Sequence, residues 1–178
     1  MSHRTPRLEI HTDRIRQNAK SVVDLCHRQG VQVACVTKVT AAHPAVAQAL
    51  VEGGADMLAD SRLENLWALR QFGFAGPFLL LRLPTLSEAA NVVRAADISL
   101  NTSMTTLRGL SEAALTAGLI HKVIIMIDVG DLREGIWPDL APEFVCRAKD
   151  LRGIEVIGLG CNLACYGGVI PTTEKMQQ

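Results

Sequence analysis

Short apolar runs rich in β-branched residues recur along the chain, separated by longer segments in which apolar residues follow a helical period. The runs occupy residues 31–37, 55–59, 77–83, 98–101, 122–129 and 155–162, so their starts lie 24, 22, 21, 24 and 33 residues apart. Continuous apolar runs of this length are typical of parallel strands that are buried on both faces. The near-constant spacing therefore predicts a series of βα units around a parallel sheet.

The segments between these runs carry signals for helices. Ser61 with Glu64, and Thr85 with Glu88, have the spacing of a capping box, in which two residues satisfy the first free backbone N–H groups of a helix. A further helix is predicted over residues 13–29, before the first strand, with one apolar stripe that would pack on the sheet. That stripe consists of Ile15, Ala19, Val22, Val23 and Cys26.

The turn after the first strand distinguishes between two kinds of α/β fold. A doubly wound sheet usually has a glycine-rich phosphate-binding turn at this place, and residues 37–42 contain no glycine. The alternative is a (β/α) barrel, which needs eight strands and roughly 250 residues. The chain is thus predicted to be α/β, a single incomplete (β/α) TIM-type barrel domain over residues 1–178 with about six parallel strands.

Composition and charge exclude several classes of partner. Lys plus Arg and Asp plus Glu are equal at 18 each, without a block of like charge, so nothing indicates binding to nucleic acid or to an anionic membrane. The longest apolar stretches, residues 123–127 and 78–81, are too short to cross a bilayer. No signal peptide, disulfide framework or CxxC pair is apparent among the five cysteines. We expect a cytoplasmic protein with reduced thiols.

Lys38 is the principal candidate for chemistry, because it directly follows the first apolar run. Ligands of α/β proteins bind at the carboxyl ends of the strands. A lysine desolvated at such a place loses basicity and can form a Schiff base. The alternative is a surface lysine whose stem lies along the sheet.

Other polar residues stand at corresponding strand ends. Asp60, Asn101, Asp128 and Asn162 follow the second, fourth, fifth and sixth runs, and Arg82 lies inside the third. In a barrel these residues would surround the active site. Asp and Asn also cap helices, and an arginine in a strand can be held by an ion pair, so each residue has a structural alternative.

Two loops add to this set. Residues 128–137 are charged and contain two glycines, and Arg133 could reach a cofactor ring or a substrate carboxylate. The alternative is a solvated turn in which Arg133 pairs with Asp131 or Glu134. Residues 160–168 are glycine-rich, so their backbone amides could bind an anion. Cys161 and Cys165 lack further ligands at suitable spacing, and we expect no metal site.

Four motifs in order, at residues 36–39, 59–65, 128–137 and 162–171, resemble the amino-terminal barrel of the alanine racemase-like, fold-type III pyridoxal-phosphate enzymes, and among them the ornithine racemases. The resemblance implies that Lys38 holds pyridoxal 5′-phosphate (PLP) as an internal aldimine and acts as acid/base at Cα of an amino acid substrate. It also implies that Arg133 lies beside cofactor and substrate, that Asn162 lines the cofactor ring, and that Tyr166 contributes to substrate binding.

The chain departs from this family in length. The family's last barrel strands, phosphate-binding cup and carboxy-terminal β domain, which carries a second proton carrier, have no counterpart in the 178 residues. We therefore expect a partial barrel that associates into a homo-oligomer and has little activity alone. Two alternatives remain open: a PLP-binding protein of the same fold type without catalysis, and a cofactor-free Schiff-base aldolase with Asp60 or Asp128 as acid/base.

Overall fold

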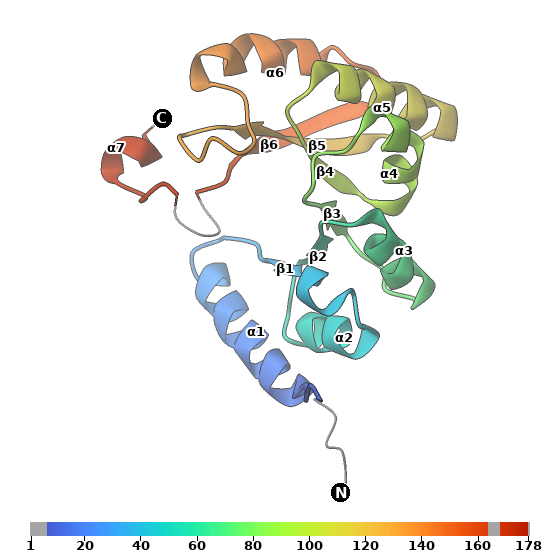
Figure 1. The fold of residues 1–178 in the computed structure, drawn as a ribbon, viewed down its shortest axis with the longest axis vertical. Coiled ribbons are helices and arrows are strands. Elements are labelled where there is room, and N and C mark those ends of the chain that lie inside the picture. The colour runs from blue at the N-terminus through green and yellow to red at the C-terminus, as the bar shows by residue number, and fades with distance from the viewer. Residues whose placement is uncertain (1–6, 164–167, 178) are drawn as a thin grey trace, which may run out of the picture.

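The computed structural model of the protein describes residues 7–163 and 168–177. Six parallel strands form one sheet, and helices follow them along the chain (Figure 1). The strands are β1 (Ala34–Val36), β2 (Met57–Asp60), β3 (Phe78–Leu80), β4 (Ile98–Asn101), β5 (His121–Ile127) and β6 (Ile154–Cys161). The α-helices are α1 (Thr12–His27), α2 (Pro44–Glu52), α3 (Leu63–Gln71), α4 (Ala89–Ala95), α5 (Met104–Ala117), α6 (Ala141–Lys149) and α7 (Thr173–Met176). Short 3₁₀ turns are η1 (Lys38–Thr40), η2 (Leu86–Glu88) and η3 (Pro138–Leu140).

The strands follow one another in the sheet in chain order, β1-β2-β3-β4-β5-β6, and every pair is parallel. This order is that of a barrel wall, and it confirms the predicted α/β class with six parallel strands. β1 and β6 each have one strand neighbour in the described part of the chain. β3 is shorter than expected, because residues 81–83 leave the sheet after Leu80.

The two faces of the sheet are buried to different extents. Alternate residues of each strand point to opposite faces. One face packs against α2 to α6 and forms the main core, which includes Leu58, Phe78, Leu107 and Ile125. The opposite, concave face has a smaller cluster, built on the buried residues Ala59, Leu79 and Ile98. Most of the buried apolar surface therefore lies between the sheet and its helices.

The first helix does not pack as predicted. α1 lies beside α2 rather than on the sheet (Figure 1). Only Ala19 and Val23 of its apolar stripe are buried, and Val22 is 52% exposed. The contact is close because Gly53 has no side chain: a Cβ there would lie 2.6 Å from the Cβ of Ala19.

One of the two predicted capping boxes forms. The Glu88 carboxylate accepts hydrogen bonds from the backbone N–H and the hydroxyl of Thr85, at 3.3 and 2.7 Å. The box at Ser61 is wrong, because α3 begins at Leu63 with Arg62 as its N-cap. Asp60 Oδ1 accepts from the backbone N–H of Arg62 instead. None of the helices in residues 7–163 and 168–177 is both long and apolar enough to cross a membrane.

Candidate functional site

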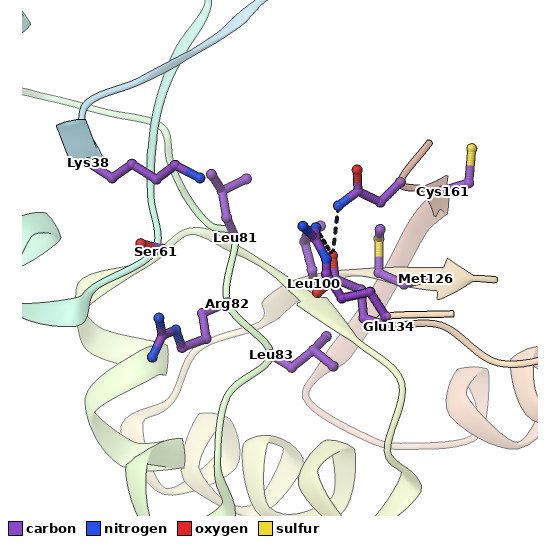
Figure 2. A pocket seen from close by; sticks show the side chains of 11 residues that line it. Lys38, Ser61, Leu81, Arg82, Leu83, Leu100, Met126, Glu134 and Cys161 are labelled. Carbon is purple, nitrogen blue, oxygen red and sulfur yellow. Dashed lines mark hydrogen bonds and ion pairs between the residues drawn. The ribbon is translucent and has the colours of Figure 1, made fainter. Parts of the chain in front are cut away.

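Lys38 lies two residues after the end of β1, as the first residue of the η1 turn. The turn is anchored to β2 through the preceding residue, Thr37, which is 1% exposed. The backbone N–H of Thr37 donates to the carbonyl of Ala59 at 2.9 Å, and its hydroxyl donates to Asp60 Oδ2 at 2.7 Å. The Lys38 side chain extends from this anchor over the concave face, toward Leu81 (Figure 2).

Lys38 is not buried as expected. Its side chain is exposed, because β1 is an edge strand of the described sheet and no strand covers its outer side. The amine nevertheless lines a cavity at the carboxyl ends of the strands. Lys38 thus lies at the cavity but is not desolvated in this structure, and its role there stays a prediction.

The cavity has a volume of about 560 Å³, and each of the six strands or the segment that follows it contributes to its lining. Its floor is apolar and includes Leu81, Leu100 and Met126. Its rim carries three cationic side chains, Lys38 among them, and one carboxylate. The place corresponds to the active-site end of a parallel barrel.

The loop after β5 is held by hydrogen bonds from its backbone to the Asp128 side chain and to β5. Asp128 Oδ1 accepts from the N–H groups of Gly130 and Leu132, at 2.8 and 3.1 Å. The loop then returns to β5, since the N–H of Ile136 donates to the carbonyl of Met126 at 2.9 Å. This return requires a glycine at position 135, where φ is +133° and a Cβ would lie 2.3 Å from the backbone nitrogen of Asp128. Side chains at the tip of this loop are therefore held over the cavity.

Arg133 and Asn162 both line the cavity. The Glu134 side chain connects them. Glu134 Oε1 accepts from Arg133 Nη2 at 2.7 Å and from Asn162 Nδ2 at 3.0 Å (Figure 2). Arg133 Nε also lies 3.7 Å from Asp131 Oδ2. Both ion pairs considered for a solvated turn are thus present, but the carboxylate side chains are only 19% (Glu134) and 11% (Asp131) exposed.

Three of the predicted strand-end residues lie away from the cavity. Asp60 is fully buried on the helix side, where its carboxylate binds Thr37, Asn65 and the start of α3. Asn101 is also on the helix side, 1% exposed, and donates to the carbonyl and hydroxyl oxygens of Ser99. Asp128 is occupied with the backbone of its own loop. All three are structural rather than cavity-lining residues.

Arg82 lies beyond the end of β3 and not inside it, and its exposed side chain lines the cavity. Among the described residues it makes no ion pair with a carboxylate. Tyr166 lies outside the described residues. Within the described ranges no group of histidine, cysteine, aspartate and glutamate side chains could hold a metal ion. Sequence reasoning missed the bridging position of Glu134, which follows from the path of its loop.

The family model for the alanine racemase N-terminal domain matches residues 10–178. The lysine racemase of Thermotoga maritima is 39% identical over 172 residues, and the ornithine racemase of Acetoanaerobium sticklandii is 39% identical over 175 residues. Both alignments cover 97% of this chain, but only 48% and 49% of the relatives, so the chain spans about half of their length.

The fold of the chain also resembles solved structures of alanine racemases. The crystal structure of alanine racemase from Streptomyces lavendulae superposes with a TM-score of 0.77 at 22% identity, covering 93% of this chain and 44% of that one. At that identity the superposition establishes the fold, and the family model establishes the membership. The chain belongs to the alanine racemase N-terminal domain family.

Proposed function

We propose that this chain is the lysine-bearing half of a PLP-dependent amino acid racemase that acts on a free amino acid with a basic side chain, as ornithine racemases do. The observation that carries the proposal is the position of Lys38, a primary amine that lines the strand-end cavity together with Arg133 and Asn162. The racemases that are 39% identical are named for lysine and ornithine, which supports the choice of substrate class.

The residues present fit PLP. The cofactor is an aldehyde, and Lys38 supplies an amine at the edge of the cavity. The volume of about 560 Å³ lies within the range of small-molecule sites. Leu81, Leu100 and Met126 give an apolar surface on which an aromatic ring could rest, and Asn162 and Arg133 give polar groups beside it.

The roles of the side chains follow from their chemistry. When bound, PLP supplies an electron sink for the carbanion at Cα of the amino acid. In the proposed reaction the Lys38 amine removes or returns the proton at Cα, and its flexible stem allows it to reach that atom. Racemisation needs a second proton carrier on the opposite face of Cα, which we assign to the part of the family's structure beyond this half.

A second candidate is a protein that binds PLP without catalysis. It needs only the Lys38 amine and the cavity that this half of the structure supplies, without a second proton carrier. The cofactor-free aldolase is not retained, because neither Asp60 nor Asp128 lines the cavity with Lys38. The cytoplasmic location and the association into a homo-oligomer remain predictions.

Titration with PLP separates these candidates. The protein should develop the visible absorbance of the bound cofactor, and borohydride reduction followed by peptide mapping should place the label on Lys38. Lys38→Ala should abolish this band. Lys122→Ala is the matched control, because Lys122 is also exposed but lies at the amino end of β5.

Optical rotation then tests for catalysis. The protein that carries this chain should remove the rotation of pure L-ornithine, and Lys38→Ala should not. A cofactor band that depends on Lys38, with unchanged rotation for basic and small amino acids, would favour the binding protein. Absence of any Lys38-dependent band would reject both candidates.

A further inference from the structure

Glu134 is the one carboxylate among the cavity-lining residues of the described chain. It lies across the cavity from Lys38 and is connected to β6 through Asn162 (Figure 2). We propose that Glu134 selects the substrate, by binding the side-chain ammonium group of a basic amino acid. This inference rests on the proposed function, and it adds the residue that determines the substrate class.

The charges around Glu134 leave a negative charge in excess. Its neighbour Arg133 is shared between two carboxylates: Nη2 lies 2.7 Å from Glu134 Oε1, and Nε lies 3.7 Å from Asp131 Oδ2. Asp131 Oδ2 is buried and accepts no hydrogen bond from the described residues, so it also draws on the Arg133 charge. One guanidinium cannot neutralise both carboxylates, and the other two cations of the rim, Lys38 and Arg82, make no ion pair with Glu134, so a second cation directly beside Glu134 is favoured.

The hydrogen bonds of Glu134 leave one oxygen available. Oε1 accepts from both Arg133 and Asn162, whereas Oε2 accepts no hydrogen bond from the described residues. Neither Lys38 nor Arg82 lies within ion-pair distance of this carboxylate. A carboxylate that is held through one oxygen and presents the other is already oriented for a ligand, which reduces the entropic cost of binding.

The chemistry of the substrate decides which cation this would be. In the proposed function the α-amine of the amino acid would be held by the cofactor in place of the Lys38 amine, so it would not be available to Glu134. The α-carboxylate has the same charge as Glu134 and is repelled by it. The group that remains is an ammonium at the end of the side chain, as in ornithine or lysine, and it can donate a charge-assisted hydrogen bond to Oε2.

The test replaces the charge and keeps the shape. In Glu134→Gln the amide oxygen can still accept from Arg133 and Asn162, while the negative charge is lost. The substrates to compare are L-ornithine and L-norvaline, which share a carbon chain and differ in the terminal ammonium. We expect the ratio of kcat/KM for ornithine over norvaline to fall roughly 10- to 100-fold, the range for one hydrogen bond to a charged group. Glu143→Gln is the control, because Glu143 is exposed on α6 and should leave the ratio unchanged.

A structural role for Glu134 gives a different result. If the carboxylate only holds Arg133 and Asn162 in place, Glu134→Gln should lower kcat/KM equally for both substrates and leave their ratio unchanged. That result would overturn the proposal.

Binding without turnover separates this proposal from the proposed function. Calorimetry on the Lys38→Ala protein with Nα-acetyl-ornithine and Nα-acetyl-norvaline, whose α-amines are blocked, should show tighter binding of the ornithine derivative, and adding Glu134→Gln should remove the difference. If the protein racemises no amino acid but this preference exists and depends on Glu134, the proposed function fails and the assignment of Glu134 stands. Equal binding of both derivatives, or a preference that survives the substitution, refutes the assignment.

Discussion

The buried histidine at the start of β5 makes the stability of this fold depend on pH. His121 is 2% exposed, and its Nε2 lies 2.8 Å from the hydroxyl of Ser99 on β4. Burial lowers the pKa of His121 to about 4 from its ordinary 6.5, and the nearby Asp97 carboxylate offsets only part of this effect. The folded protein therefore keeps the imidazole neutral at pH values where the unfolded chain binds a proton.

The sign and the size of the effect follow from this difference. Between pH 6.5 and about 4 the unfolded state binds more protons than the native state, so the free energy of unfolding falls as the pH falls. The stability contributed by the neutral His121 is fully present above pH 6.5 and is lost by about pH 4. The change from 6.5 to about 4 corresponds to about 3 kcal/mol, at about 1.4 kcal/mol for each pKa unit.

Urea unfolding followed by circular dichroism at pH 7.5, 6.5, 5.5 and 4.5 measures this slope. His121→Gln keeps a hydrogen-bonding side chain beside Ser99 and cannot titrate, so its stability should depend much less on pH across this range. His11→Gln is the control, because His11 is exposed. Equal slopes for the wild type and His121→Gln would refute the reasoning. The acidic groups whose pKa is lowered, such as Asp56, titrate mainly below this window and are common to all variants.

Two further substitutions test the supports of the site. Thr37→Val removes the hydroxyl that donates to Asp60, so the free energy of unfolding should fall by about 1–3 kcal/mol. The affinity for PLP, measured by titration, should fall with it. Thr116→Val, on the exposed side of α5, is the control and should change neither the stability nor the PLP affinity. Gly135→Ala would put a methyl group 2.3 Å from the backbone nitrogen of Asp128, so PLP affinity should fall by at least tenfold. The control is Gly158→Ala, where a methyl group would meet no atom within 4 Å and PLP should bind normally. Unchanged PLP affinity in both test variants would show that these supports are not needed.

The order and the type of the elements could be predicted because the physical signals are local. Strands buried on both faces need continuous apolar runs, and each of the six runs overlaps a strand of the sheet, with β2, β5 and β6 extending one residue beyond their runs. The ends of the strands are not defined by local signals in the same way. Residues 81–83 continue the apolar run of β3, but only pairing with β2 and β4 defines a strand, and that pairing ends at Leu80.

The direction of side chains at the strand ends could not be predicted in the same way. Lys38, Asp60 and Asn101 all follow or end an apolar run, yet only Lys38 faces the cavity. Val36 pairs with Ala59, so Thr37 and Asp60 share the helix side and Lys38, one residue later, falls on the concave face. A shift of one residue in this register would exchange the two faces. The register depends on contacts between segments that are more than 20 residues apart, and a local pattern does not contain it.

The pair formed by Thr37 and Asp60 connects the two faces of the sheet. Stability depends mainly on the helix side, where the larger core lies, and the proposed chemistry depends on the concave side, where Lys38 and Glu134 line the cavity. The Asp60 carboxylate is buried in the first of these regions, without a cationic partner among the described residues, and it accepts hydrogen bonds from Thr37, Asn65 and the start of α3. Because a buried polar group is costly unless its hydrogen bonds are made, these bonds favour one arrangement of Asp60 and Thr37. That arrangement fixes the residue before Lys38, so the backbone from which the Lys38 side chain starts is positioned by packing on the face opposite to the one where the amine acts.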